Sequence, residues 1–296
     1  MVVVDVARVC NASCIHCAYR VVKDDPLFQE GPKFMSWNVF KVIADECSQY
    51  PDLNFRFTCH GEPLLHPKII AMVKYAKKLG ISPVSINTNG SLLTEDMAEA
   101  LIRTGIDVIE VSLDAFSKEK YEAVRRNLNF ENTMENLKNL IRLKENLKTD
   151  TRILVSIIDQ PETNAELEDF QSYWEGKVDR VIKRIYFSHD GLTPSDKITF
   201  DIPDSRHPCP FLWKRIVVTS DGRVKFCLED WLDRKVTPFP ALSSIHKIWK
   251  SQWYDSIRKL HLENKFPEIP FCSDCKDWWA HFWEKDYFYA LGMTGD

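Results

Sequence analysis

The sequence predicts an α/β fold in which a parallel sheet is covered by helices and is followed by a smaller second domain. Strand-like and helix-like segments alternate six times between residue 2 and about residue 190, which is typical of βαβ units. This alternation stops at a linker that contains Pro203, Pro208 and Pro210. We therefore place the two domains at residues 1–202 and 203–296.

Short β-branched and aromatic runs indicate the strands of the first domain. We expect them at residues 2–6, 53–58, 84–87, 108–113, 153–158 and 181–187. Between the strands, apolar residues recur at helical spacing. Ser36 is a typical cap for the first helix, and Gly80 and Gly105 are typical of the ends of the next two. The helices are expected at residues 37–47, 67–78, 94–103, 118–125, 132–145 and 164–174.

The second domain is predicted to contain a β-hairpin and a helix. Two strand-like runs, at residues 215–219 and 223–226, flank an Asp-Gly dipeptide that favours a tight turn. A helix is expected near residues 245–260, and an aromatic-rich stretch follows at residues 278–289. The tryptophans of this stretch are expected to pack across the small domain rather than to line a pocket. They are Trp278, Trp279 and Trp283.

Three cysteines follow the first predicted strand with the spacing C-x3-C-x2-C. They are Cys10, Cys14 and Cys17. Three thiolates on one loop can bind three irons of a [4Fe–4S] cluster and leave the fourth iron open, whereas an electron-transfer cluster normally has four cysteine ligands. An open iron is the arrangement used to cleave S-adenosylmethionine (SAM) into a carbon radical. A three-cysteine zinc site would need a fourth donor, and His16 lies within the motif, where it could not readily reach the same ion.

Four further cysteines form a second set in the C-terminal domain. They are Cys209, Cys227, Cys272 and Cys275. This arrangement suits either a structural zinc ribbon or a second [4Fe–4S] cluster with no open iron. Beside an open-iron cluster we favour the second cluster, for electron transfer or support of the fold. Of the remaining cysteines, Cys47 is expected in the core, and Cys59 either fills a loop or donates a hydrogen atom to a substrate radical.

Composition excludes several classes of protein. The net charge of −4 argues against a nucleic-acid-binding surface. No apolar run approaches the roughly 18–20 residues needed to span a membrane, and the N-terminus lacks the features of a signal peptide. Nine cysteines without such a signal indicate a cytoplasmic protein with metal-bound thiols rather than disulfides.

Polar residues also lie at the carboxyl ends of the next predicted strands, where parallel sheets bind their ligands. Gly61-Glu62-Pro63 follows the second strand, Asn87 ends the third, and Ser112 and Asp114 end the fourth. With the three N-terminal cysteines, these residues resemble the radical SAM superfamily, specifically its members with a C-terminal SPASM or Twitch domain. The resemblance implies a partial (βα)6 TIM-like barrel followed by a small iron–sulfur domain made of a hairpin and a helix.

The resemblance also implies roles for individual residues. Gly61, Glu62 and Pro63 match the element that contacts the methionine amino group of SAM, and Asn87 begins the motif beside it. Ser112, Asp114 and Arg125 match positions that contact the methionine carboxylate and the ribose. Two residues depart from the family pattern. His16, counted among the cofactor-binding residues, replaces a usual aromatic residue, and His60 replaces the first of two usual glycines.

The cofactors implied are a SAM-binding [4Fe–4S] cluster, SAM and one auxiliary [4Fe–4S] cluster. The spacing of the last four cysteines is similar to that of the aminocyclitol dehydrogenase of butirosin biosynthesis. We therefore expect a small-molecule oxidoreductase that converts a secondary alcohol of a sugar or aminocyclitol to a ketone. An external donor such as flavodoxin or ferredoxin would supply electrons. The general base is expected among His60, Asp159, His189 and Asp190.

Three alternatives remain open. A radical epimerase would use Cys59 as its hydrogen-atom donor. An enzyme that modifies ribosomal peptides would usually carry a leader-binding module before the barrel. In this sequence only nine residues precede Cys10. An electron carrier or a zinc-stabilised binding protein would not cleave SAM at all.

Overall fold

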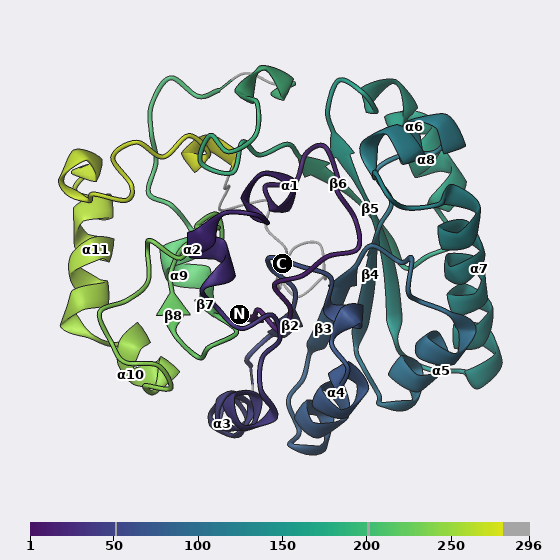
Figure 1. Ribbon diagram of the computed structural model, residues 1–296, viewed down its shortest axis with the longest axis horizontal. Coiled ribbons are helices and arrows are strands. Elements are labelled where there is room, and N and C mark those ends of the chain that lie inside the picture. Colours follow the sequence, from purple (N-terminus) through teal and green to yellow (C-terminus); the bar gives the residue numbers. More distant parts are fainter. Residues whose placement is uncertain (51, 200–201, 281–296) are drawn as a thin grey trace.

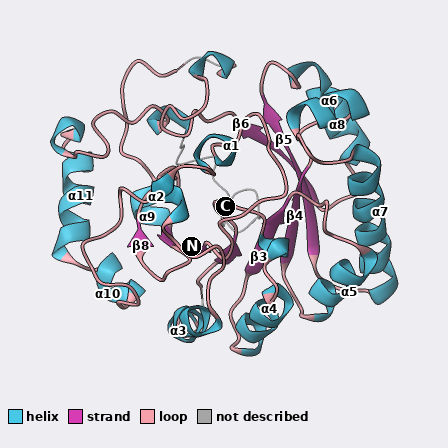
Figure 2. Cartoon of the chain, viewed as in Figure 1, coloured by secondary structure: helices cyan, strands magenta, loops and turns pink. Residues whose placement is uncertain are grey.

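The computed structural model describes residues 1–50, 52–199 and 202–280, and it confirms the α/β fold (Figure 1). Six parallel strands pair in the order in which they occur along the chain. They are β1 Val2–Val4, β2 Phe55–Phe57, β3 Val84–Thr88, β4 Val108–Ser112, β5 Arg152–Asp159 and β6 Arg180–Ile185. Helices cover the outer side of this sheet, as the alternation of segments predicted, and the arrangement is the partial barrel that the family resemblance implied (Figure 2).

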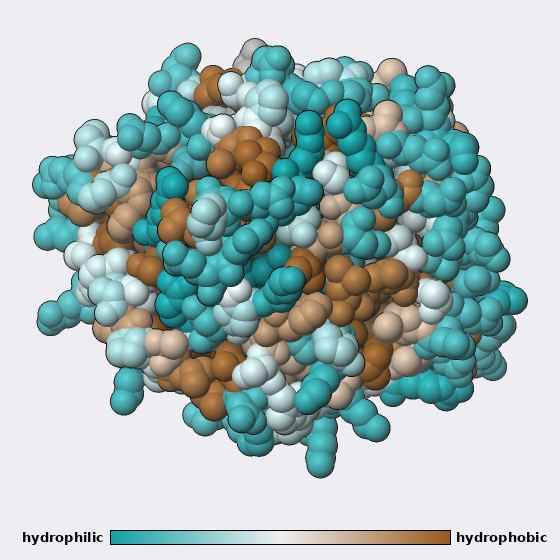
Figure 3. Space-filling model, in the orientation of Figure 1, coloured by the Kyte–Doolittle hydropathy of each residue, from teal (hydrophilic) through white to brown (hydrophobic). Residues whose placement is uncertain are grey.

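The barrel helices follow the expected pattern of caps and apolar faces. They are α3 Trp37–Cys47, α4 Ile69–Lys78, α5 Glu95–Arg103, α6 Lys118–Val124, α7 Phe130–Leu147 and α8 Leu167–Trp174. Ser36 caps α3 and Thr94 caps α5, each by accepting a backbone N–H in the first turn. Leu137 and Leu140 lie on the buried face of α7, whereas the surface over α5 and α7 is hydrophilic (Figure 3).

Several segments differ from the sequence prediction. The helix expected at residues 245–260 is two helices, α10 Ile245–Trp249 and α11 Gln252–Leu262. Ser251 causes the break, because its hydroxyl accepts the Tyr254 N–H at 3.2 Å and so begins a new helix. Short elements that were not predicted also occur. They are α1 Tyr19–Val22, α2 Pro26–Gln29, α9 Phe211–Lys214, η1 Pro63–Leu65, η3 Ser195–Lys197, η4 Phe266–Glu268 and η5 Trp278–Ala280. The helix expected at residues 164–174 is present as η2 Asn164–Glu166 followed by α8.

The C-terminal hairpin extends the barrel sheet. Its strands are β7 Ile216–Val218 and β8 Val224–Lys225, joined at the predicted Asp-Gly turn. β7 pairs with β1 in parallel, so the complete sheet has the order β6-β5-β4-β3-β2-β1-β7-β8. The domain boundary after residue 202 stays a prediction. Trp279 is buried, whereas Trp283 lies outside the described residues.

Charged side chains occupy the inner side of the sheet. Ile109 and Val111 on β4 pack in the main hydrophobic core, so Glu110 between them points the opposite way. Glu110 is fully buried and pairs with Arg56 of β2 at 2.9 Å and with Arg184 of β6. Burial alone would raise the pKa of Glu110, but the two arginines hold it below its ordinary value.

A second buried charge network joins the hairpin to the first two strands. The Lys225 ammonium on β8 lies 3.0 Å from Asp233 Oδ1, 3.0 Å from His60 Nε2 and 2.5 Å from the Asp230 carbonyl. Asp233 also pairs with Arg8, on the loop after β1. Burial would lower the pKa of Lys225, but Asp233 raises it overall, so the lysine is held as a cation.

Lys225→Met should lower the free energy of unfolding by about 3–5 kcal/mol, because it removes one partner of a buried ion pair and leaves Asp233 less compensated. Chemical denaturation monitored by circular dichroism measures this change. Lys138→Met on the exposed face of α7 is the matched control and should have little effect. Equal stability of the two variants would contradict this role of Lys225.

Candidate active site

The loop between β1 and α1 carries all three N-terminal cysteines. They are Cys10, Cys14 and Cys17. Backbone hydrogen bonds hold the two halves of this loop. The Glu62 N–H donates to the Val9 carbonyl at 2.9 Å, and the Ile15 N–H donates to the Val124 carbonyl at 2.9 Å. The cysteine loop is therefore fixed against both the β2 loop and the end of α6.

The spacing of the thiol groups is too wide for a single zinc ion. Sulfur ligands of a tetrahedral zinc site lie roughly 3.8 Å apart, given Zn–S bonds of about 2.3 Å. Across the described part of the chain, no three of the cysteine sulfur atoms lie within 4.8 Å of one another. This holds for the N-terminal set and for the C-terminal set. Neither set of thiols is therefore gathered as closely as a tetrahedral zinc site requires.

Hydrogen-bond donors surround the N-terminal thiols. Arg125 Nη1 lies 3.9 Å from the sulfur of Cys14, and Asn89 Nδ2 lies 4.0 Å from the sulfur of Cys10. Burial raises the pKa of Cys10 to about 12 and also raises the pKa of Cys14. A bound metal cation would favour the thiolate forms, and nearby N–H groups can stabilise the resulting sulfur charge.

The Glu62 carboxylate is held by three donors next to the cysteine loop. Its Oε1 accepts from the Thr88 hydroxyl at 2.7 Å and the Leu64 N–H at 3.0 Å, and its Oε2 accepts from the Asn89 N–H at 2.8 Å. Burial raises the pKa of Glu62 above its ordinary value, although these three donors oppose the rise. Pro63 begins η1 directly after it. The arrangement fixes the direction of a carboxylate that can still accept from a ligand ammonium group.

Gly61 allows the β2 loop to approach the cysteine loop closely. A Cβ atom at this position would clash with the carbonyl oxygens of Ala7 and Val9 and would lie 2.8 Å from the Val9 nitrogen. These are backbone atoms, so they cannot move aside as a flexible side chain could. Glycine is therefore required here by space.

Asp114 connects several of the other predicted cofactor-binding residues. Its Oδ2 pairs with Arg125 and lies 3.3 Å from His16 Nε2, while its Oδ1 accepts the Ile158 N–H at 3.0 Å. Burial lowers the pKa of His16 to about 4, so this ring is neutral. His16 Nδ1 and Arg125 Nε are buried without a partner among the described residues.

Asn87 and Ser112 meet at the ends of β3 and β4. The Ser112 hydroxyl donates to Asn87 Oδ1 at 3.1 Å. Every cofactor-binding residue expected from the sequence therefore lies at the carboxyl ends of β1 to β4 or in the segments that follow them. Their individual roles toward SAM stay predictions.

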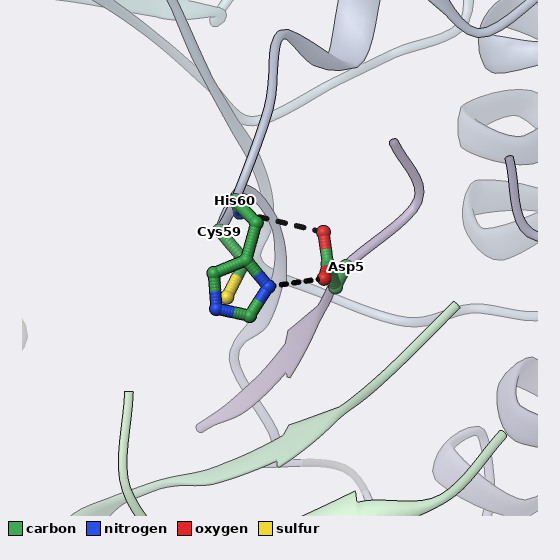
Figure 4. Close-up of side chains that lie close together, drawn as sticks. All are labelled: Asp5, Cys59 and His60. Carbon is green, nitrogen blue, oxygen red and sulfur yellow. Dashed lines mark hydrogen bonds and ion pairs between the residues drawn. The ribbon is translucent and has the colours of Figure 1, made fainter. Parts of the chain in front are cut away.

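Cys59 and His60 lie against Asp5, at the end of β1 (Figure 4). His60 Nδ1 is 2.6 Å from Asp5 Oδ2, and Nε2 is 3.0 Å from the Lys225 ammonium. Burial lowers the pKa of His60, and Lys225 lowers it further. A neutral ring that donates to Asp5 and accepts from Lys225 uses both of its nitrogens. Proton transfer from a substrate would require one of these contacts to break.

Ligand atoms of Asp5, Cys59 and His60 lie within 4.8 Å of one another. This spacing would suit a metal ion, but the Lys225 ammonium already supplies the positive charge beside His60. Cys59 has a φ of 138°, a conformation that favours glycine. Burial raises the pKa of Cys59 well above its ordinary value, so its side chain is a neutral thiol.

The turn after β6 brings His189 between the two sets of cysteines. His189 Nε2 donates to the His16 carbonyl at 3.0 Å, and Nδ1 lies 2.6 Å from Glu229 Oε2. His16 belongs to the N-terminal motif, and Glu229 follows Cys227 by two residues. Burial would lower the pKa of His189, but Glu229 raises it overall.

Asp190 lies beside the C-terminal set of cysteines. Its carboxylate is 2.8 Å from the Lys235 ammonium, and its side chain is 30% exposed. His189 and Asp190 both have positive φ angles, of 50° and 59°. Asp277 supports this turn, because its buried carboxylate accepts the Ser188 N–H at 2.7 Å and the Asp190 N–H at 2.6 Å.

The C-terminal cysteines come from three separate segments. They are Cys209 before α9, Cys227 after β8, and Cys272 and Cys275 after η4. Burial, together with the neighbouring Cys272 and Cys275, raises the pKa of Cys209 to about 12. Tyr254 on α11 is completely buried, and its hydroxyl has no partner among the described residues.

Sequence reasoning missed several residues around the two sets of cysteines. They are Glu229, Lys235, Tyr254 and Asp277. Two of them could have been found from the sequence. Glu229 and Asp277 each follow a cysteine by two residues, and this closeness was a signal that they lie near the site. Lys235 and Tyr254 carried no local signal, because long-range folding brings them to the site.

The comparison with protein families decides the identity of the barrel. The sequence model of the radical SAM superfamily matches residues 4–172, which is more than half of the chain. The chain belongs to the radical SAM superfamily. A second model, of the SPASM iron–sulfur cluster-binding domain, matches residues 209–276 and includes all four C-terminal cysteines.

Other proteins resemble this chain over most of its length. It is 24% identical to the tungsten-containing aldehyde ferredoxin oxidoreductase cofactor-modifying protein of Pyrococcus furiosus, covering 90% of this chain and 84% of that protein. The structure of BtrN in complex with AdoMet and 2-DOIA matches with a TM-score of 0.61 and 20% identity, covering 93% and 92% of the chains. SuiB of Streptococcus suis, solved with the precursor peptide SuiA, matches with a TM-score of 0.69 and 14% identity, covering 87% and 66%.

Membership of this superfamily implies a [4Fe–4S] cluster and SAM, and the SPASM domain implies auxiliary iron–sulfur binding. The residues fit these groups. Both sets of thiols are spaced too widely for zinc, and buried polar atoms of His16, Arg125 and Tyr254 lack partners within the described ranges. In residues 1–50, 52–199 and 202–280, no helix combines the length and apolar character that crossing a membrane requires.

Gly61→Ala should lower the free energy of unfolding by about 1–3 kcal/mol and weaken SAM binding, because the new methyl group pushes the cysteine loop away from Glu62. Denaturation and equilibrium binding of SAM to the anaerobic protein measure the two effects. Gly31→Ala is the matched control, since the atoms nearest to its Cβ, at 3.3–3.5 Å, belong to the Arg8 side chain and not to the backbone. Unchanged SAM affinity in Gly61→Ala would contradict this role for the close approach.

Cys14→Ser should reduce the iron content of the anaerobically reconstituted protein from about eight to about four per chain, because one of two [4Fe–4S] clusters loses a ligand. Iron and sulfide analysis measures this change, and SAM cleavage should stop. Cys47→Ala, in the core of α3, should keep all of the iron. Zinc in the N-terminal site would contradict the assignment.

Proposed function

We propose that this radical SAM protein oxidises a secondary alcohol of a sugar or aminocyclitol to a ketone. The position of Asp190 carries the proposal. This partly exposed carboxylate lies beside the auxiliary site, while its neighbour His189 contacts the SAM-cluster loop. A substrate held between the two sets of cysteines could therefore lose a proton to the protein and an electron toward the auxiliary site.

When bound, the two clusters and SAM supply two things: the acceptor for one electron, and the 5′-deoxyadenosyl radical, which takes a hydrogen atom from the substrate carbon. The side chains hold these groups and the substrate. Cys10, Cys14 and Cys17 would bind the SAM-binding cluster. Glu62 would accept the SAM ammonium group, and the Asp114–Arg125 pair would face its carboxylate and ribose. The other four cysteines would bind the auxiliary cluster.

Asp190 is the best placed of the four candidate bases. His60 and His189 each use both ring nitrogens in buried contacts. Asp159 and Asp190 each pair with a lysine, Lys183 at 2.7 Å and Lys235 at 2.8 Å, so the ion pair does not distinguish them. Asp190 is coupled electrostatically to Cys272 and Cys275, so the proton and the electron would leave the substrate toward the same region. The substrate then loses one hydrogen atom, one proton and one electron, which balances the conversion of an alcohol to a ketone.

The likeness to BtrN supports a small substrate. BtrN and this chain cover more than nine-tenths of each other, and BtrN was solved with 2-DOIA. SuiB, which was solved with a precursor peptide and is matched over 66% of its length, supports a peptide substrate as the alternative.

Epimerisation is a second candidate, and it rests on Cys59. A hydrogen-atom donor must be a thiol rather than a thiolate, and burial keeps Cys59 protonated beside the β2 loop. Oxidation and epimerisation give different products. A ketone would form in the first case and a stereoisomer of the substrate in the second.

Asp190→Asn should lower ketone formation by about a hundredfold or more, because general-base catalysis typically contributes at least that factor. The assay uses the reconstituted protein with reduced flavodoxin, SAM and a panel of 2-DOIA, inositols and hexoses, and it measures ketone and 5′-deoxyadenosine separately. Formation of 5′-deoxyadenosine should continue in the variant, since SAM binding is unaffected. Asp169→Asn on the exposed side of α8 is the matched control.

Three results would contradict the proposal. They are a stereoisomer as the sole product, modification of a peptide but of none of the small molecules, and undiminished ketone formation by Asp190→Asn. A stereoisomer whose formation stops in Cys59→Ala would establish the epimerase instead.

A further inference from the structure

Helix α11 presents one buried face to the auxiliary site. Tyr254, Ile257 and His261 lie on this face, spaced three and four residues apart. Tyr254 and His261 are both 0% exposed. His261 Nδ1 accepts the backbone N–H of Cys209 at 3.3 Å, so α11 directly positions one cysteine of the site.

Neighbouring rings fix the Tyr254 side chain. Its ring centroid lies 5.2 Å from that of Trp249, 6.1 Å from that of Trp253 and 6.3 Å from that of Phe226. Phe226 immediately precedes Cys227. The aromatic contacts therefore hold Tyr254 against the segment that carries this second cysteine.

The Tyr254 hydroxyl is one of several buried polar groups without a hydrogen-bond partner among the described residues. It is shielded from solvent, and no described residue donates to it or accepts from it. Buried hydroxyl groups almost always have a partner, because an unsatisfied donor is destabilising. Burial raises its pKa, so the hydroxyl is protonated and able to donate.

We propose that the Tyr254 hydroxyl donates a hydrogen bond to a sulfur atom of the auxiliary cluster and thereby raises its reduction potential. The acceptor is the sulfur of Cys209 or Cys227, or an inorganic sulfide beside them. The inference depends on the auxiliary cluster that the SPASM family match implies, and it is independent of the alcohol oxidation proposed above.

The direction of the effect follows from charge. Reduction adds one electron to the cluster, so its sulfur atoms become more negative and accept hydrogen bonds more strongly. A donor next to the cluster therefore stabilises the reduced form more than the oxidised form. Tyr254 would make the auxiliary cluster a better electron acceptor without altering the SAM-binding cluster.

The test compares wild-type protein with Tyr254→Phe, which keeps the aromatic packing and removes only the hydroxyl. Both proteins are reconstituted anaerobically, and EPR-monitored redox titration follows the two clusters separately. At a fixed potential, the ratio of reduced to oxidised auxiliary cluster should fall about tenfold, as expected for loss of one hydrogen bond to a charged group. The SAM-binding cluster is the internal reference and should not change.

Tyr173→Phe on α8 is the matched control, because it makes the same chemical change outside both sites. An unchanged auxiliary potential in Tyr254→Phe would overturn the proposal. A second measurement decides the matter even if that variant fails to hold its cluster. ENDOR spectra of the wild-type protein in H2O and D2O should show an exchangeable proton coupled to the auxiliary cluster. The Tyr173→Phe variant should retain this proton. Its absence in the wild type would overturn the proposal.

Discussion

The close approach of two backbone segments at Gly61 is the constraint on which the candidate active site depends. The residue lacks a side chain, so the loop after β2 can lie directly on the loop after β1. The Glu62 N–H then reaches the Val9 carbonyl, and the Glu62 carboxylate is turned toward Thr88 and Asn89 at the end of β3. Three strand ends are thereby tied together in one region, with the cysteine loop held over them.

The turn after β6 closes this region from the other side. Two consecutive residues with positive φ angles are sterically unfavourable, and they persist here because Asp277 accepts two N–H groups of the turn. Since Asp277 follows Cys275 by two residues, the geometry of the turn depends on the folding of the C-terminal cysteine segment. The two cofactor sites are therefore structurally coupled, through His189 on one side of the turn and Asp277 on the other.

Local patterns predicted most of the barrel and most members of the candidate site. Alternating periodicity located the six strands, and the spacing of Cys10, Cys14 and Cys17 indicated the cluster that the family match supports. Such local patterns could not predict contacts between residues that lie far apart in the sequence. Lys225 meets His60 across 165 positions, and His189 meets His16 across 173. The break between α10 and α11 was also missed, because Ser251 was not recognised as a cap within an apolar periodic segment.

The parallel pairing of β7 with β1 has a consequence for how the chain can be divided. Removal of the residues after the barrel would expose the backbone N–H and carbonyl groups along one side of β1, which β7 now satisfies. An unpaired, strongly apolar Val2–Val4 strand is a template for association with other chains. The iron–sulfur domain therefore also protects the barrel against aggregation, and an isolated barrel fragment would need another means of covering that edge.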